Sequence, residues 1–226
     1  MVKYTEPSTC VDSMRRAVVG MRSRLLRTAD GRRFAVRRMR ADDRELLEAA
    51  LDGLSERSRY LRFASPLPRP SRRLLDHLMD LDDHRHVAYA ALTPDQSALV
   101  GAARYVRLAD DLDTAEVAVA IADAWQRVGV GRLLMSRLIM HASRAGVGSL
   151  IAVTLSQNGG AKALAYDVGF APTGPLGLYS NYRMELADAR GIPGQHRSVV
   201  GSLHTGRVSR RLSRQASRVA KDVVEH

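Results

Sequence analysis

Cysteine and long apolar runs are both scarce in this chain of 226 residues. The single cysteine, Cys10, excludes a disulfide framework and a cysteine-based zinc cluster. No apolar run approaches the roughly 20 residues that a membrane span needs. The N-terminus also lacks the apolar stretch and the small-residue cleavage site of a secretory signal. With 45% hydrophobic residues the chain is not disordered, so we expect a soluble, cytoplasmic protein with one folded domain and flanking segments.

The net charge of +11 is concentrated at the two ends of the chain. Residues 1–40 carry a net charge of +8 and residues 187–226 carry +5, whereas residues 41–186 carry −2. A nucleic-acid-binding domain more often gathers its positive charge on the folded face. We therefore expect an ordinary domain at residues 33–187 between basic extensions at residues 1–32 and 188–226.

Both extensions contain apolar residues at helical spacing. In the first they are Met14, Val18, Met21 and Leu25; in the second, after a linker rich in Gly and Pro, they are Val208, Leu212, Val219 and Val223. Basic amphipathic segments of this kind are candidates for contact with nucleic acid or a membrane surface. The first stripe is equally typical of a helix packed on the domain or of leader sequence. Nothing in the sequence indicates an oligomeric state.

The central region alternates between strand and helix patterns. We expect strands at 34–36, 87–92, 99–106, 115–121 and 149–155, with a last apolar stretch near 170. We expect helices that start near 42, at 55, after 71, at 129 and at 161. The segment Thr93–Ser97 suits a hairpin turn. This order predicts an α+β (mixed α/β) fold, in which helices flank a sheet of mixed direction.

A glycine-containing loop, Gln126–Leu134, follows a strand and opens a helix. Its backbone N–H groups and the helix N-terminus are suited to bind a diphosphate, and Arg127 and Arg132 add positive charge. A P-loop is excluded because Arg132 and Leu133 follow Gly131, and a dinucleotide fingerprint is excluded because the third glycine and the later acidic residue are missing. A Gly-x-Gly pair by itself often marks only a tight turn. The strand before it, the helix after it and Asn158 at the end of the next strand favour a ligand site.

The sequence Gln126-Arg127-Val128-Gly129-Val130-Gly131 resembles the Arg/Gln-x-x-Gly-x-Gly/Ala motif of the GNAT N-acetyltransferases. Further segments in matching order resemble the bacterial Pat-type protein lysine acetyltransferase module: LSERSRYLRF (54–63), RHVA (85–88), GAARYVR (101–107), DTAEVAVAIADAWQ (113–126) and YDVGF (166–170). The resemblance implies a GNAT acyl-CoA N-acyltransferase fold, with acetyl-CoA as co-substrate and no metal. It implies that Val119, Ile121, Gln126, Arg127, Val128, Gly129, Val130, Gly131, Arg132 and Asn158 bind acetyl-CoA.

Glu116 is the candidate general base. An amine with a pKa of about 10.4 must lose a proton before it can attack, and burial among Ala, Val and Ile would raise the pKa of Glu116 toward a useful range. The resemblance gives the same role to a glutamate at this position. Alternatively, Glu116 is solvated or paired with an arginine such as Arg104. A backbone N–H near Val119 to Ile121 would hold the oxyanion if the strand bulges there.

Some features fit less well. The position at which many GNAT enzymes carry a tyrosine acid is Ala165, and we expect the neighbouring Tyr166 to pack instead. The Asp82–His86 segment has metal-ligand residue types without a supporting cluster. The arginines of 57–62 either steer an acidic substrate or are solvated.

The sequence therefore predicts an N-acetyltransferase that acts on an amine, with a protein lysine as the first choice of acceptor. The alternatives are a small-molecule amine acetyltransferase and a non-catalytic acyl-CoA-binding or interaction module.

Overall fold

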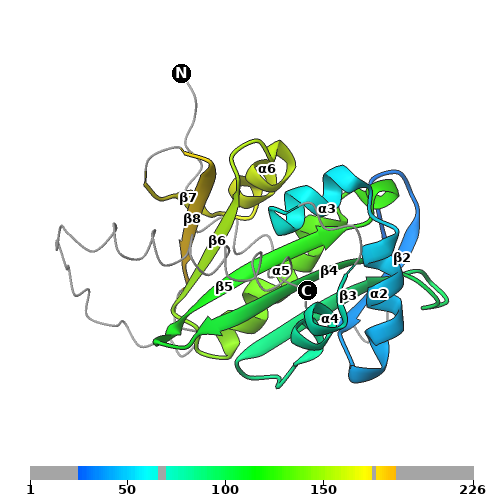
Figure 1. Ribbon diagram of the computed structural model, residues 1–226, viewed down its shortest axis with the longest axis horizontal. Helices are drawn as coiled ribbons and strands as arrows, with labels where there is room; N and C mark the ends of the chain where they lie inside the picture. The colour runs from blue at the N-terminus through cyan, green and yellow to red at the C-terminus, as the bar shows by residue number, and fades with distance from the viewer. Residues whose placement is uncertain (1–24, 66–69, 175–176, 187–226) are drawn as a thin grey trace.

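The computed structural model describes residues 25–65, 70–174 and 177–186 of the chain. The described strands form one eight-stranded sheet in the order β1-β2-β3-β4-β5-β6-β8-β7 (Figure 1). The strands are β1 (Leu26–Arg27), β2 (Arg33–Arg38), β3 (His86–Leu92), β4 (Leu99–Leu108), β5 (Asp111–Ile121), β6 (Ser149–Leu155), β7 (Ala171–Pro172) and β8 (Tyr179–Glu185). The described α-helices are α2 (Arg44–Asp52), α3 (Glu56–Phe63), α4 (Arg72–Met79), α5 (Val130–Arg144) and α6 (Gly159–Asp167). The mixed α+β class expected from the sequence is confirmed.

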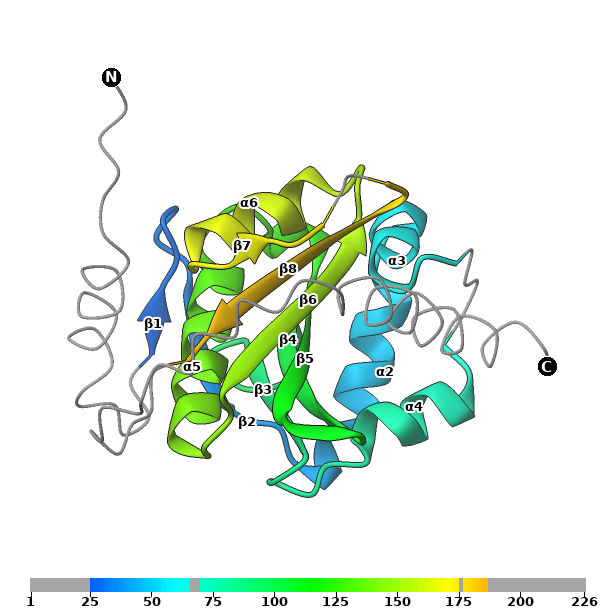
Figure 2. The same ribbon diagram turned by 90° about the vertical axis from the view of Figure 1, so that its left-hand side faces the viewer.

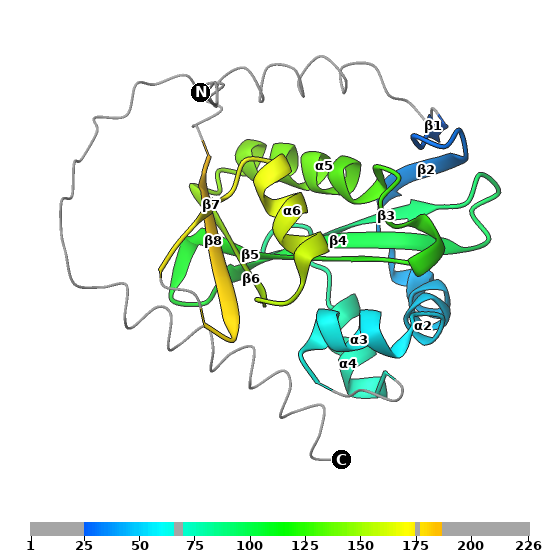
Figure 3. The same ribbon diagram turned by 90° about the horizontal axis from the view of Figure 1, so that it is seen from above.

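Helices cover both faces of the sheet (Figure 3). Helices α5 and α6 lie on one face, and α2, α3 and α4 lie on the other. Strand β3 contributes side chains to the hydrophobic cores on both faces of the sheet. Val87 and Ala91 lie in the core under α5, and Ala88 and Ala90 lie in the core under α2 to α4. This alternation follows from the two-residue period of a strand.

Serine N-caps define the first residues of α3 and α4, two helices on the same face of the sheet. The Ser55 hydroxyl accepts a hydrogen bond from the N–H of Ser58 at the start of α3. The Ser71 hydroxyl accepts one from the N–H of Leu74 at the start of α4. Each cap satisfies an N–H that the first helical turn leaves free. Both starts agree with the sequence prediction.

The pairing of the sheet changes direction at β5. Neighbouring strands from β1 to β5 are antiparallel, β5 and β6 are parallel, and β6 and β8 are antiparallel again. The parallel ladder between β5 and β6 covers three residue pairs and ends where Glu116 faces Ile151. Beyond this pair the two strands diverge (Figure 1).

The sequence prediction missed the strand that completes this part of the sheet. Strand β8 pairs with β6 over all seven residues of each and lies alongside it, with β7 beyond (Figure 2). Strand β5 also begins at Asp111, four residues before the expected start, and α6 begins at Gly159, two residues before its expected start.

The expected helical stripes of the two ends lie outside the described residues, apart from Leu25. Strand β1 lies within the segment assigned to the N-terminal extension and pairs with β2. The domain boundaries at 33 and 187 stay predictions. No helix in the described ranges combines the length and the apolar character that crossing a bilayer requires, and the cytoplasmic location stays a prediction.

Candidate active site

The divergence of β5 from β6 leaves backbone groups of β5 without a strand partner on that side. The N–H of Ala122 donates to the carbonyl of Val100 in β4, at an N–O distance of 3.0 Å. Because backbone groups alternate sides along a strand, the N–H groups of Val119 and Ile121 point away from β4, toward β6. In the described chain the β5–β6 ladder has already ended at Glu116. Val119 and Ile121 thus present amide N–H donors where the resemblance places acetyl-CoA.

The described strand β5 has no bulge near Val119 to Ile121, where a bulge was the condition for an oxyanion donor. The register between β4 and β5 is continuous from the Gly101–Ile121 pair to the Arg107–Ala115 pair, and it shifts only between Arg107 and Leu108. A bulge is therefore unnecessary for exposing these N–H groups, because the early end of the β5–β6 ladder exposes them.

The glycine loop turns its N–H groups toward one side. Arg127 has a φ of 62° and Gly129 a φ of 95°, and an alternation of left-handed and right-handed residues makes successive amides converge on an anion. Gly129 is the N-cap of α5, and the first helical bond runs from the N–H of Leu133 to its carbonyl. The N–H groups of Val130, Gly131 and Arg132 therefore belong to the free first turn. These donors and the helix dipole fit a diphosphate.

The residues of the glycine loop differ in burial and in their contacts with the rest of the protein. Val130 is completely buried, so only its backbone is available to a ligand. Gln126 braces the loop, because its Nε2 donates to the Ile121 carbonyl at 3.0 Å. The Val128 carbonyl accepts from the N–H of Ala29 at 3.1 Å. Arg132 is exposed and lies 3.2 Å from the Asp167 carboxylate.

Asn158 lies at the same edge of the sheet as the glycine loop, because β5 and β6 run parallel and both end toward that edge. Its Oδ1 accepts the N–H of Ala161 at 3.0 Å and caps α6. A role for Asn158 in binding acetyl-CoA stays a prediction. The cap uses the side-chain oxygen, so a ligand would contact the amide NH₂.

Glu116 is the last β5 residue of the parallel ladder and its side chain lies on the face covered by α3 and α4. Burial raises the pKa of Glu116, and the positive charge of Arg62 in α3 partly opposes this rise. On the same face, Ala118 and Ala120 are small and partly exposed, which leaves room beside the carboxyl. The alternative of an arginine partner for Glu116 stays open: the positive charge that acts on Glu116 is that of Arg62.

A buried cationic cluster lies next to Glu116, formed by Arg62, Arg104 and His86. Arg104 of β4 pairs with Ala118, so it is a diagonal neighbour of Glu116 on the same face. Its Nη1 lies 3.1 Å from the Nε2 of His86. Burial lowers the pKa of Arg104 to about 9, and the charge of Arg62 adds to this effect. The sequence indicates Arg104 as a possible partner of Glu116 and Arg62 as one of the surface arginines of 57–62. It does not predict the cluster, because no local pattern links residues on three separate elements.

Two other sequence candidates have local roles. In the Asp82–His86 segment, the Asp82 carboxylate accepts the N–H groups of His84, Arg85 and His86 and so shapes a turn. Among the described residues, no group of three or more His, Cys, Asp and Glu side chains is placed to hold a metal ion. Tyr166 is 54% exposed, and its ring meets Tyr182 edge-on at 5.5 Å, so the expected packing is confined to this contact.

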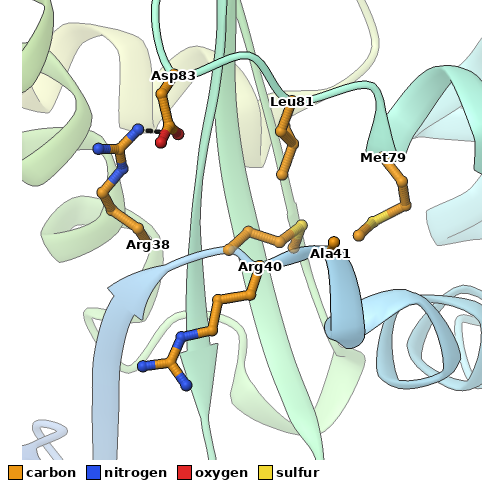
Figure 4. A pocket seen from close by; sticks show the side chains of 7 residues that line it. Arg38, Arg40, Ala41, Met79, Leu81 and Asp83 are labelled. Carbon is orange, nitrogen blue, oxygen red and sulfur yellow. Dashed lines mark ion pairs between the residues drawn. The ribbon is translucent and has the colours of Figure 1, made fainter.

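A cavity of about 290 Å³ lies apart from these residues, between the end of β2, the end of α4 and the loop that follows α4. Arg38 and Asp83 form an ion pair at its rim, and Met79 and Leu81 line it (Figure 4). None of its lining residues belongs to the glycine loop or to the cluster around Glu116. We therefore place the candidate active site at the β5–β6 divergence.

Fold and site together define an acyltransferase-like arrangement, and comparison with known proteins gives the family. Residues 46–170 match the acetyltransferase (GNAT) family. The chain is 34% identical over 143 residues to acetyltransferase PA5475 of Pseudomonas aeruginosa, which covers 62% of this chain and 76% of that protein. The chain therefore belongs to the GNAT family of acetyltransferases.

The expected likeness to Pat-type modules is confirmed by two relatives. The chain is 32% identical over 115 residues to acetyltransferase Pat of Mycolicibacterium smegmatis, and the match covers 50% of this chain but only 34% of that protein. The crystal structure of the GNAT domain of S. lividans PAT superposes with a TM-score of 0.67 at 26% identity, covering 73% of this chain and 97% of that one.

Proposed function

We propose that this chain transfers the acetyl group of acetyl-CoA to an amine, with a protein lysine as the first acceptor to test and Glu116 as the general base. The observation that carries the proposal is the position of Glu116. A carboxyl whose pKa is raised by burial stands at the residue where the β5–β6 ladder ends and free amides begin.

The glycine loop supports binding of the donor. The N–H groups of Gly129, Val130 and Gly131 would hold the diphosphate of acetyl-CoA, and the positive end of α5 would stabilise its charge. The N–H groups of Val119 and Ile121 would bond the rest of the donor along β5. Acetyl-CoA supplies a thioester, which is an activated acyl group.

The chemistry follows from the residues around the thioester. Glu116 takes a proton from the ammonium of the acceptor, and the free amine then attacks the thioester carbonyl. The Val119 N–H would stabilise the oxyanion that forms. The C–N bond forms and the C–S bond breaks. The thiolate leaves without a dedicated acid, because a thiol with a pKa of about 8.5 is a fair leaving group, and it takes up the proton that the attacking nitrogen loses as the amide forms.

The charge of the cluster supports a base in its active form. Arg62 opposes the rise in the pKa of Glu116 and so favours the ionised carboxylate that a general base requires. The positive charges of Arg62 and Arg104 also disfavour an ammonium beside them, so they favour release of the amine proton to Glu116.

The decisive variant is Glu116→Gln. A general base contributes about 10²- to 10⁴-fold, so kcat/KM should fall by about that factor while acetyl-CoA affinity, measured by calorimetry, stays the same. Glu48→Gln on the exposed side of α2 is the matched control and should change neither quantity. Unchanged turnover in Glu116→Gln would remove the base assignment.

The acceptor is tested separately. Full-length protein is incubated with isotopically labelled acetyl-CoA and either a mixture of proteins or a panel of small amines, and mass spectrometry locates the label. Label on lysine side chains supports a protein acceptor, and label on small amines alone supports the small-molecule alternative. Absence of label in both, with acetyl-CoA bound, would favour a non-catalytic acyl-CoA-binding module.

A further inference from the structure

Arg104 is a buried charge whose hydrogen-bonding capacity is mostly unused. Its side chain belongs to a residue that is only 7% exposed. A guanidinium has five N–H donors. Within the described parts of the chain, one of these donors has a partner, the Nε2 of His86 at 3.1 Å. None of the Arg104 nitrogens is a buried atom without a partner, so the remaining donors reach solvent and are accessible to a ligand.

His86 does not carry a charge that could balance Arg104 or compete with it. The His86 Nδ1 lies 2.7 Å from the Asp80 carbonyl, which only accepts, so Nδ1 carries the proton. The Nε2 is then the acceptor for Arg104. His86 therefore fixes one edge of the guanidinium and leaves its other donors directed elsewhere.

On this face of the sheet two cations, Arg62 and Arg104, face one carboxylate, Glu116, and His86 is neutral. Asp80, whose charge acts on His86, is exposed to solvent. An excess buried charge is costly unless a ligand of opposite charge arrives. Ala118 lies opposite Arg104 and two residues from Glu116, and Ala120 follows it on the same face. Both are small and partly exposed, which leaves space for that ligand on the α3 face of the sheet.

We propose that Arg104, together with Arg62, forms a subsite for a carboxylate carried by the acceptor amine. This inference rests on the proposed function. Arg104 and Glu116 are diagonal neighbours on adjacent strands, a spacing of about 7–8 Å between α-carbons. A single acceptor therefore reaches both if its carboxylate lies a few bonds from its amine. A planar guanidinium held at one edge suits the two oxygens of a carboxylate.

Such a carboxylate has two sources, and the experiment distinguishes them. One source is a free amino acid, represented by γ-aminobutyrate, with its amide as the uncharged twin. The other is an acidic side chain beside a lysine, represented by N-acetyl-aspartyl-lysine amide, with the asparaginyl peptide as its twin. Full-length protein saturated with CoA is titrated with each compound by calorimetry, and kcat/KM is measured with acetyl-CoA.

In at least one pair of compounds, we expect the one with the carboxylate to bind about 10- to 100-fold more tightly than its uncharged amide analogue. Its kcat/KM should be higher by about the same factor. The pair that shows the preference identifies the source. Arg104→Gln and Arg62→Gln should bring the ratio within that pair close to one and leave the KM for acetyl-CoA unchanged. Arg104→Lys should retain more of the preference than Arg104→Gln. Lysine keeps the positive charge but lacks the paired N–H donors of a guanidinium.

Equal binding of the twins in both pairs by wild-type protein would overturn the subsite, whether or not they are acetylated. This comparison needs no variant, so it decides even if Arg104→Gln fails to fold. If twins are acetylated equally, the subsite fails and the proposed function stands. If Glu116→Gln retains full turnover, the base assignment fails independently of the subsite.

Discussion

Protonation of His86 should make folding stability fall on acidification, and replacement by Gln should remove that fall. His86 is 6% exposed and neutral, with Nδ1 donating to the Asp80 carbonyl and Nε2 accepting from Arg104. Burial lowers its pKa to about 4, and the charges of Arg104 and, to a lesser degree, His77 add to this effect. A proton on Nε2 would point a donor at the Arg104 guanidinium.

The sign and size of the effect follow from linkage. The unfolded chain binds a proton on this histidine with a pKa of about 6.5 and the folded chain only at about 4, so acid favours unfolding. The stability from His86 is complete above about pH 6.5 and is lost as the pH falls toward 4. The full difference corresponds to about 3 kcal/mol as an upper limit. We expect about 2 kcal/mol, because partial solvation of the ring reduces the penalty.

Urea unfolding at about pH 7 and about pH 4.5 measures this loss in wild type and in His86→Gln. Glutamine keeps a donor and an acceptor but does not titrate in this range. Other groups titrate in both proteins, including Glu116, whose raised pKa has the opposite effect on stability, so the difference between the two slopes isolates His86. Identical pH slopes in the two proteins would refute the assignment of a neutral, buried His86.

Three further outcomes are expected. Gly129→Ala forces a side chain onto a φ of +95°, so it should lower the free energy of unfolding in urea by about 1–2 kcal/mol and weaken acetyl-CoA binding measured by calorimetry. Asp43 is 2% exposed, and its carboxylate accepts hydrogen bonds from both terminal nitrogens of Arg37 at 2.7 Å. Asp43→Asn removes the negative charge of this ion pair and should lower the free energy of unfolding by about 3 kcal/mol in the same assay. The acidic limb of the kcat/KM profile should lie above the ordinary glutamate pKa, because the base must be ionised and burial raises the pKa of Glu116, and this limb should disappear in Glu116→Gln.

Sequence predicted the parts of this fold that depend on local signals. The serine caps before α3 and α4 and the apolar run of β6 gave correct starts because each signal lies within a few residues of the element it defines. The glycine loop was located for the same reason. Strand β8 was missed because its sequence, YSNYRME, has few aliphatic residues, and its strand structure depends on pairing with β6 on one side and β7 on the other.

The position of the glycine loop and the burial of Glu116 could be predicted from sequence, but the charges around Glu116 could not. A glutamate within a run of small apolar residues indicates an unusual carboxyl from sequence alone. The identity of its cationic neighbour depends on how α3 lies over β5, which brings Arg62 rather than Arg104 to oppose the pKa rise. The bulge was a reasonable way to free backbone donors, but ending a parallel ladder early frees them without disturbing the β4–β5 register.

Glu116, at the last residue pair of the β5–β6 ladder, separates two parts of β5 that differ in their strand pairing. Up to Glu116 the strand is held on both sides, by Val106 of β4 and by Ile151 of β6, so the carboxyl stands on a fixed backbone. Beyond it β4 is the one strand that pairs with β5 among the described residues. A one-residue slip in the β4–β5 register would move Glu116 to the face where Ala115 is completely buried under α5. The register that packs the α5 core is therefore the same register that places Glu116 on the α3 face, so the core and the candidate site cannot be altered independently along this strand.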